Sequence, residues 1–370
     1  MKVLLIIDSL SLGGAERVLA TLAHAGRGVG LDFDALVLSE AADGRTQMLR
    51  TLRDAGLAPQ FAGVRALRDP LAVPRLARWI RASGCDVVHS HLEYSTVLGT
   101  VAAKAMGVPA VSTLHHMPEQ LPVRERAKEA LAVAIGGRGD ALIFVSHAAR
   151  SAFATRYRPR PSWQVLHNGI DLSSFYPGEE VPPPQLALEP DALVVTMVAA
   201  MRGRKGHDLM LDSWSQVVRG ASTACLVLVG SGPEESALRQ RARNLGIQDS
   251  VRFVGQSQDV ASILRASSVV VLPSETEALP TVLIEAGGCG VPAVATDVGG
   301  VADVIEDGIT GLLLPIGDGR QLVAHLLRLL DDSVLRMTMG AAARARVEQR
   351  FDMHRWAEQL KQVYAGAADR

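Results

Sequence analysis

The sequence predicts an α/β protein with two doubly wound, parallel β-sheets, and three observations support this prediction. Short apolar runs alternate with longer amphipathic patterns along most of the chain, as strands alternate with helices in a parallel sheet. The alternation stops at a proline-rich stretch near residues 177–190 and then starts again. At 370 residues the chain exceeds the usual size of one domain. We therefore expect one lobe at residues 1–175, a linker at 176–190 and a second lobe at 191–353.

The first lobe begins with the apolar run Lys2–Ile7, which we expect to be a buried strand. A loop over residues 8–14 with a Gly13-Gly14 pair leads into a helix expected from Ala15 to about His24. Glycines at such a turn let the backbone approach a ligand closely. Further strands are expected at residues 34–38, 86–89, 108–113, 141–145 and 164–166, with helices at 74–83 and 94–106.

Two pairs of histidines follow expected strands of this lobe, where ligands of such sheets bind. They are His89 with His91, and His115 with His116. No acidic residue accompanies them at ligand spacing, so a metal site is the poorer interpretation. We interpret His89 and His91 as polar residues at the sheet edge.

The second lobe is organised around residues 269–300. Here we expect a buried strand at Val269–Leu272, a loop that closes at Pro280, a helix at 281–286 and a strand at 292–296. Other strands are expected at 193–199, 226–229 and 251–255, and residues 307–315 close the sheet. A helix from Gly319 has four leucines on one face: Leu322, Leu326, Leu329 and Leu330.

Two acids flank the expected helix start, Glu277 before it and Glu285 on its second turn. Pro280 suits the first helical position, and the free N–H groups from Thr281 onward attract phosphate. Carboxylates accept hydrogen bonds from sugar hydroxyls. Together these features suggest a nucleotide sugar as ligand, although two acids alone are more often solvated charges beside an ordinary turn.

A second cluster of charge lies in the loop MRGRKGH, where Arg202, Arg204 and Lys205 fall within four residues. Such a cluster needs an anion or water around it. An anion-binding loop and a solvated loop both fit the sequence.

The longer motif resembles the signature of the retaining GT-B glycosyltransferases of family 4 (group 1), which carry a Glu-(seven residues)-Glu motif. The resemblance is carried by Pro273, Ser274, Glu277, Leu279, Pro280, Glu285, Ala286, Gly290, Pro292, Gly299 and Gly300. The family usually has glycine where this chain has Ala278, and a position that needs positive φ would disfavour alanine. The segments GGAERV, TLHH, LHNGIDLSSF and Lys205-Gly206 resemble further segments of that family.

The resemblance implies a GT-B fold whose site lies in the cleft between the lobes, with a C-terminal helix at about 354–370 joining the first lobe. It implies that Glu277 and His115 lie at the transferring sugar and are the catalytic residues. The residues it implies for donor binding are Gly14, Arg202, Lys205, Leu279, Pro280, Thr281 and Glu285. No metal and no cofactor is expected, because Lys205 and helix-end N–H groups can stabilise the leaving diphosphate.

The expected reaction is transfer of a sugar, with retention, from a nucleotide diphosphate sugar to an acceptor. Family frequency favours uridine as the base, and bacterial cell-surface polysaccharide or lipid-linked oligosaccharide synthesis, including lipopolysaccharide, as the setting. A small soluble acceptor is the alternative. The sequence also leaves open an epimerase or phosphorylase of the same fold and a non-catalytic nucleotide-sugar binding module. A dehydrogenase would need the glycine fingerprint that the first loop lacks.

Composition narrows the expected cellular location and the expected kinds of ligand. Three widely spaced cysteines, Cys85, Cys225 and Cys289, favour neither a disulfide framework nor a zinc site. No apolar run approaches the ~20 residues that a membrane helix needs. The expectation is a cytoplasmic protein that binds no nucleic acid. The first half carries a small excess of basic residues, which would suit an anionic acceptor or peripheral contact with the membrane.

Overall fold

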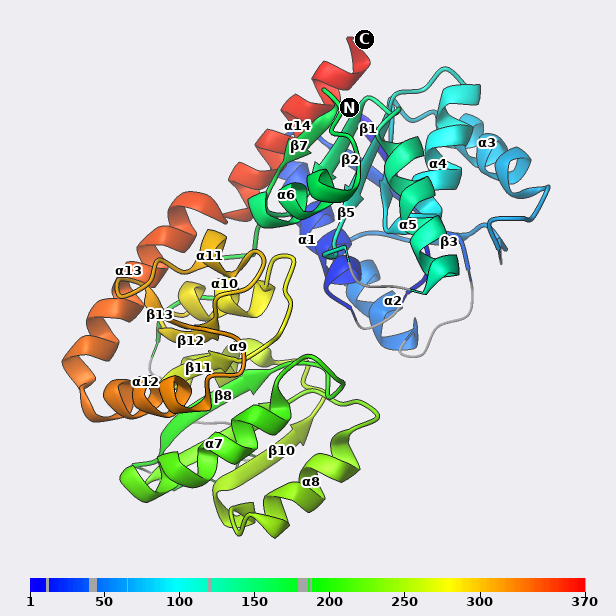
Figure 1. Cartoon of the computed structure of the whole chain (residues 1–370). Coiled ribbons are helices and arrows are strands. Elements are labelled where there is room, and N and C mark those ends of the chain that lie inside the picture. The colour runs from blue at the N-terminus through cyan, green and yellow to red at the C-terminus, as the bar shows by residue number, and fades with distance from the viewer. Residues whose placement is uncertain are drawn as a thin grey trace. The chain divides into compact units, whose positions relative to one another are not determined.

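The computed structural model describes all residues except 11–12, 40–44, 65, 119–121, 179–185, 187, 190 and 370. Clustering of contacts divides the chain into two compact units (Figure 1). Unit 1 consists of Met1–Gly169 and Phe351–Arg370, and unit 2 is Ile170–Arg350. Most of the proline-rich stretch, including Pro182, Pro183, Pro184 and Pro190, lies outside the described residues.

Unit 1 contains a parallel seven-stranded sheet in the order β3-β2-β1-β4-β5-β6-β7. Its strands are β1 (Lys2–Ile7), β2 (Asp32–Val37), β3 (Gln60–Phe61), β4 (Val87–His91), β5 (Ala110–Leu114), β6 (Ala141–Phe144) and β7 (Trp163–Val165). Chain order reverses direction between the neighbours β1 and β4. This is the doubly wound arrangement that the sequence predicts, and β1 has the predicted bounds.

Helices cover both faces of this sheet, so β1 is buried on both sides. Val3, Leu5 and Ile7 share a core cluster with one set of helices, and Leu4 and Ile6 share another. The helices are α1 (Gly14–Gly28), α2 (Arg45–Asp54), α3 (Ala72–Ser83), α4 (Glu93–Ala105), α5 (Val123–Gly136), α6 (His147–Arg156) and α14 (Met353–Ala368). The sequence patterns did not predict α2, α5, α6 or β3.

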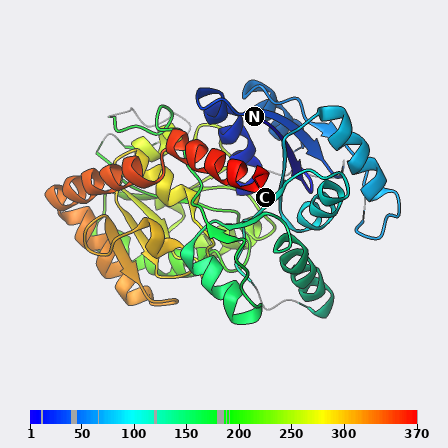
Figure 2. The ribbon, with the colours of Figure 1, turned by 90° about the horizontal axis from the view of Figure 1, so that it is seen from above.

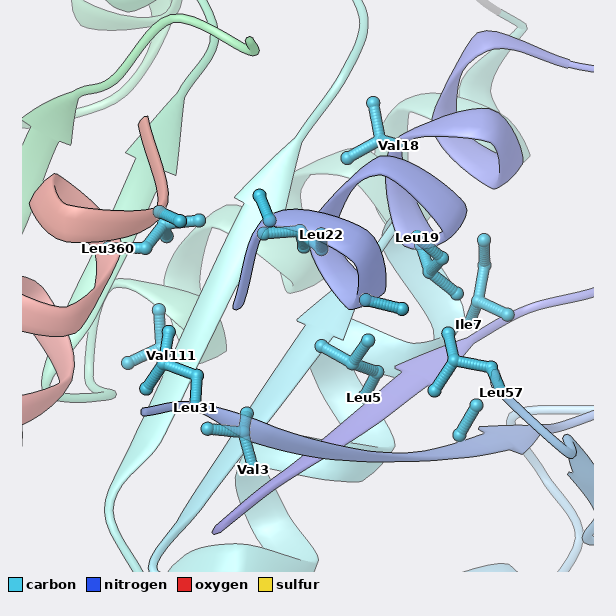
Figure 3. Packing of buried hydrophobic residues seen from close by; sticks show 14 of the residues in the cluster. Val3, Leu5, Ile7, Val18, Leu19, Leu22, Leu31, Leu57, Val111 and Leu360 are labelled. Carbon is cyan, nitrogen blue, oxygen red and sulfur yellow. The ribbon is translucent and has the colours of Figure 1, made fainter. Parts of the chain in front are cut away.

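The last helix, α14, packs beside α1 although more than 300 residues separate them in the chain (Figure 2). Figure 3 shows Leu5 and Ile7 of β1 beneath Leu19 and Leu22 of α1, with Leu360 of α14 at the side of the same core. The C-terminal segment thus completes the core of unit 1.

Unit 2 contains a parallel six-stranded sheet in the order β10-β9-β8-β11-β12-β13. Its strands are β8 (Leu193–Val198), β9 (Ala224–Val229), β10 (Val251–Gly255), β11 (Val269–Leu272), β12 (Ala293–Thr296) and β13 (Gly311–Leu314). Here the reversal falls between β8 and β11. The predicted bounds of β10 and β11 agree with the structure, and β12 begins one residue later than expected.

The helices of unit 2 are α7 (His207–Gly220), α8 (Glu235–Asn244), α9 (Val260–Arg265), α10 (Thr281–Gly288), α11 (Val301–Val304), α12 (Gly319–Asp331) and α13 (Ser333–Arg350), with a short 3₁₀ helix, η2 (Gln248–Ser250). The predicted leucine face of α12 is confirmed, since all four leucines are buried. Among the described residues, no helix has both the length and the apolar character needed to cross a membrane.

The packing of α14 predicts a large effect for Leu360→Ala. Leu360 is 1% exposed, and removing a buried leucine side chain costs about 2–5 kcal/mol. Urea unfolding should show this loss. Glu358→Ala, at an exposed position of the same helix, is the control and should change stability by no more than about 0.5 kcal/mol. Equal stability of the two variants would contradict the packing described here.

Candidate active site

The reversal of strand order in unit 2 creates the first candidate site. The loops after β8 and β11 start from neighbouring strands and emerge at the carboxyl edge of the sheet. In open α/β sheets this is the position where ligands bind. The two loops contain the predicted residues Lys205 and Glu277.

Backbone contact fixes these two loops against each other. Gly206 has φ of +79°, and a Cβ added to it would overlap the carbonyl oxygen of Pro273. The N–H of Glu275 donates to the carbonyl of Arg204 at 2.9 Å. Glycine at position 206 is therefore required twice, by its backbone angle and by the close approach.

The contact brings the ammonium of Lys205 within 2.7 Å of Oε1 of Glu277. These side chains are 22% and 12% exposed, so both remain accessible from solution. An ammonium has three donor hydrogens, so Lys205 can hold Glu277 and still bind an anion. The two residues that the sequence places on separate loops thus form one charged pair.

A third loop, after β12, supports Glu277 from behind. Gly299 has φ of +51°, and a Cβ there would overlap the carbonyl oxygen of Glu277. The N–H of Gly300 donates to the same carbonyl at 3.0 Å. This explains why a pair of glycines follows β12.

The helix α10 begins at Thr281, four residues beyond Glu277. Pro280 is the extended N-cap residue, not the first helical residue as predicted, and no side chain caps the helix. The first N–H groups, from the partly exposed Thr281 onward, therefore stay available to an anion. Leu279 is buried at 9% exposure. Ala278 does not have positive φ, so alanine in place of the family's glycine costs no backbone strain.

The remaining predicted residues of unit 2 differ in burial. Glu285 is 8% exposed on the second turn of α10, so it is not a solvated surface charge. The side chain of Arg202 is exposed, and no described contact joins it to Lys205 or Glu277. Arg204 has φ of +70° and its Nε lies 3.7 Å from Glu275, with both side chains about half exposed.

Two polar residues of these loops were not predicted as site residues. Ser274 is fully buried, and within the described part of the chain its hydroxyl has no hydrogen-bond partner. Both ring nitrogens of the buried His207 also lack one there. Burial lowers the pKa of His207 to about 4, with Lys205 lowering it further against the opposite effect of Asp208, so the ring is neutral at pH 7. Buried polar atoms without partners are uncommon and mark places where a ligand or water completes the bonding. Ser274 belongs to the motif that carries the family resemblance, but nothing in the sequence indicated that its hydroxyl or the ring of His207 is buried without a described partner.

Unit 1 has a second candidate site at its own reversal, between β1 and β4. The helix α1 begins at Gly14, and a Cβ at Gly14 would have no neighbour within 4 Å. Gly13 has φ of −100° and ψ of 172°, angles that any residue can adopt. The packing of the described residues therefore does not require glycine at position 14, and the backbone angles do not require it at position 13.

Histidines occupy the adjoining strand ends of unit 1. His89 and His91 lie inside β4 and are 1% exposed, so the expectation that they are polar residues at the sheet edge is wrong. His89 bonds to the hydroxyls of Tyr364 at 2.7 Å and Thr113 at 2.8 Å, and His91 Nδ1 lies 2.9 Å from Nε2 of His115. Burial lowers the pKa of His89 and His115 to about 3 and that of His91 well below its ordinary value. All three rings are neutral at pH 7.

Carboxylates complete this edge of unit 1. Asp8, at the end of β1, accepts hydrogen bonds from the N–H groups of Tyr94 (3.1 Å) and Ser95 (2.6 Å) at the start of α4. Glu93 lies 3.4 Å from Nε2 of His116. Burial, and then the charge of Asp8, raises the pKa of Glu93 from 4.5 to about 7. Within the described residues, no group of three or more His, Cys, Asp or Glu side chains is arranged to hold a metal ion.

Comparisons with known proteins agree with this geometry. Two family models match adjoining parts of the chain, Glycosyltransferase Family 4 over residues 12–174 and Glycosyl transferases group 1 over residues 180–346. The chain is 30% identical over 306 residues to the D-inositol 3-phosphate glycosyltransferase of Saccharomonospora viridis, covering 76% of this chain and 70% of that protein. It is 27% identical over 300 residues to the N-acetyl-alpha-D-glucosaminyl L-malate synthase of Bacillus anthracis, covering 80% and 78%.

A solved structure shows the same fold. The Anabaena protein HepE, crystallised with UDP-glucose, matches with a TM-score of 0.83 and 22% identity over 99% of both chains. The likeness confirms the predicted GT-B fold.

The close contact between Gly299 and the carbonyl of Glu277 predicts that Gly299→Ala lowers the free energy of unfolding by more than the positive φ alone would. Positive φ costs an alanine about 1–2 kcal/mol, and the displaced carbonyl of Glu277 adds to this. Gly308→Ala is the matched control, since Gly308 has φ of +75° and open space around its Cβ position. Urea unfolding of both variants tests the difference. Equal losses of stability in the two variants would show that the loops move apart without a cost in free energy.

The raised pKa of Glu93 predicts a pH-dependent effect of Glu93→Gln. An acid with a higher pKa in the folded state binds more protons when folded, so its contribution to stability falls as pH rises from about 4.5 to 7. The free energy of unfolding of the variant, relative to that of the unmodified protein, should therefore increase as pH rises across this interval and stay constant above it. Denaturant titrations at several pH values test this, with Glu358→Gln as an exposed control. A pH-independent difference would place Glu93 in a water-like environment.

Proposed function

The chain belongs to glycosyltransferase family 4 (group 1), whose members are retaining, nucleotide-sugar-dependent transferases, and on this premise we propose that it transfers a hexosyl group from a UDP-sugar to a carbohydrate hydroxyl. The observation that carries the proposal is the Lys205–Glu277 pair beside the uncapped start of α10. A cation and a row of free N–H groups suit the diphosphate, and the carboxylate suits the sugar hydroxyls. The structure of HepE with UDP-glucose supports uridine as the base.

Each predicted residue has a role in this proposal. Lys205 and the N–H groups near Thr281 bind the diphosphate, with Leu279 and Pro280 shaping the loop and Gly14 leaving room for it. Arg202 is a further candidate for the phosphates, because its exposed side chain belongs to the Lys205 loop. The buried Glu285 binds the ribose. Glu277 and His115 hydrogen-bond the transferring sugar.

Positive charge from Lys205 and the start of α10 is proposed to stabilise the leaving diphosphate without a metal ion. The departing phosphate oxygen then accepts the proton of the acceptor hydroxyl on the face from which it leaves. The new bond forms on that face, so the anomeric configuration is retained.

The charge at the carboxyl edge of unit 1 supports a neutral acceptor. The described side chains there include Asp8, Glu16 and Glu93, together with neutral histidines. Lys128 is bound to Glu125 at 2.8 Å. The remaining negative charge of these acids, of which Glu93 is about half protonated at pH 7, disfavours an anion near the reacting hydroxyl. This favours a saccharide, as in polysaccharide or lipid-linked oligosaccharide synthesis at the cytoplasmic side of a membrane, over small acceptors such as the L-malate and D-inositol 3-phosphate in the names of the two relatives.

The reaction is tested by incubating the protein with UDP-glucose, UDP-galactose or UDP-N-acetylglucosamine and a panel of neutral glycosides, phosphorylated sugars and lipid-linked saccharides. We expect UDP release that depends on the acceptor, and a product of unchanged anomeric configuration by NMR. Binding of UDP-sugars without release of UDP for any acceptor would instead indicate a binding module. An inverted anomer would overturn the mechanism.

Lys205→Ala should weaken binding of UDP by about 10- to 150-fold, because a hydrogen bond to a charged group contributes about 1.5–3 kcal/mol. Calorimetric titration measures this directly. Arg219→Ala, which removes an exposed cation from α7 of the same unit, should leave the affinity unchanged. If both variants bind UDP as the unmodified protein does, Lys205 is not a phosphate ligand.

Glu277→Gln and His115→Ala should reduce kcat more than they reduce affinity for the donor. The proposed contact of Glu277 strengthens as positive charge develops on the sugar, and that of His115 holds the sugar in the reacting orientation, so both contacts act mainly on the transition state. Turnover and the donor Kd are measured separately for each variant. Near-normal kcat in both would remove these residues from the reacting centre.

A further inference from the structure

The histidine pair of unit 1 has a geometry that the reaction scheme has not used. His91 lies at the end of β4, and His115 follows the neighbouring strand β5. His91 Nδ1 and His115 Nε2 are 2.9 Å apart. The ring centroids are 5.2 Å apart, which fits an edge-to-edge hydrogen bond between two imidazoles, and the ring planes are inclined by 21°. His89 packs on the inner side of His91, with ring centroids 4.2 Å apart, and limits its movement.

Only one ring of the pair can donate this hydrogen bond. Burial lowers the pKa of both histidines, so each is a neutral imidazole with a single N–H. Either His91 donates from Nδ1 and leaves its Nε2 bare, or His115 donates from Nε2 and the proton of His91 lies on Nε2. The two arrangements present opposite chemistry at Nδ1 of His115.

The surroundings of His91 Nε2 decide between them. This nitrogen is buried and has no hydrogen-bond partner among the described residues. A buried N–H without an acceptor is rarer in proteins than an acceptor without a donor. Free imidazole slightly prefers the proton on Nε2, but this preference is small beside the penalty for a buried donor without a partner. The proton of His91 therefore belongs on Nδ1, where it is shared with His115.

We propose that His91 is a positioning residue that holds His115 in its Nδ1–H form, so that His115 presents a hydrogen-bond donor at the carboxyl edge of unit 1. His115 is partly exposed, and its Nδ1 is not among the buried atoms that lack a partner in the described structure. As a donor, His115 suits an oxygen of the sugar and cannot take a proton from the acceptor through Nδ1. The role in transfer rests on the proposed function; the tautomer does not.

The tautomer is measured by ¹⁵N NMR of the full chain labelled in its histidine rings at pH 7, without ligand. The signals of His115 are assigned by their loss in His115→Gln. We expect a protonated Nδ1 and a bare Nε2. The opposite pattern in the unmodified protein overturns the proposal, and this measurement needs no further variant to fold.

Three variants separate positioning from general damage. His91→Ala removes the donor and leaves room for a water molecule that can accept a hydrogen bond from Nε2 of His115. His115 should then shift towards the Nε2–H form that free imidazole prefers, and kcat with UDP-glucose should fall by about 2- to 10-fold at unchanged donor Kd, the factor that one neutral hydrogen bond supplies. His91→Asn restores a donor near the place of Nδ1 and should recover both the tautomer and most of kcat. Ser90→Ala is the control, because the buried Ser90 hydroxyl has no partner and its removal should change neither.

The outcomes distinguish this inference from the proposed function. A His115 tautomer that is the same in His91→Ala and in the unmodified protein overturns the positioning role. If the tautomer changes as expected but the protein does not release UDP for any acceptor, the positioning by His91 stands and the proposed function fails.

Discussion

Close backbone contact at the carboxyl edge of unit 2 is the constraint on which the candidate donor site depends. Gly206 and Gly299 each have positive φ, and each lies against the carbonyl of a residue in the β11–α10 loop. A side chain at either glycine would separate the loops. The pair of Lys205 and Glu277 needs this contact, because the two residues are 72 positions apart in the chain. Local backbone geometry thus determines the charge arrangement that binds the ligand.

Unit 1 uses burial in a comparable way, to keep its polar residues neutral. His89 lies deep in β4, and its ring is held by Thr113 on one side and by Tyr364 on the other. Tyr364 comes from α14, so the C-terminal helix contributes to the polar interior as well as to the apolar core. Burial raises the pKa of Tyr364 strongly, so its hydroxyl stays protonated and can donate or accept. This part of the site is therefore set by uncharged hydrogen bonds.

Most strands of unit 2 could be predicted well because they are buried on both faces and form continuous apolar runs, as β11 does. The same rule misplaced the end of β4, where His89 and His91 interrupt the apolar run but remain in the strand. The helix α5 was missed because its charged residues, Arg126 and Lys128 among them, are equally typical of a loop. Polar residues in buried or amphipathic elements are recognisable only when their partners are known.

The motif residues themselves were predictable, but their pairings were not. Glu277, Glu285 and Lys205 stand out by type and spacing, whereas a site role for His207, and for Ser274 of the same motif, is indicated only by buried atoms that lack partners among the described residues. Sequence also left open whether Ala278 is strained, and the structure shows that it does not have positive φ. Contacts between loops that are far apart in the sequence depend on the order of the strands in the sheet. That order is a property of the whole fold and cannot be read from any one stretch of the sequence.

The Lys205–Glu277 pair also explains how one small site can serve both parts of a nucleotide sugar. An accessible ion pair is worth only about 0–1 kcal/mol, because solvent competes with it. A diphosphate carries more negative charge than one carboxylate, so in the proposed reaction it attracts Lys205 more strongly. Glu277 is held by its backbone to Gly299 and Gly300, so it stays in place when its side chain is released. The freed carboxylate is then available to the sugar hydroxyls at the moment when the phosphates arrive, and binding of the two halves of the donor becomes coupled.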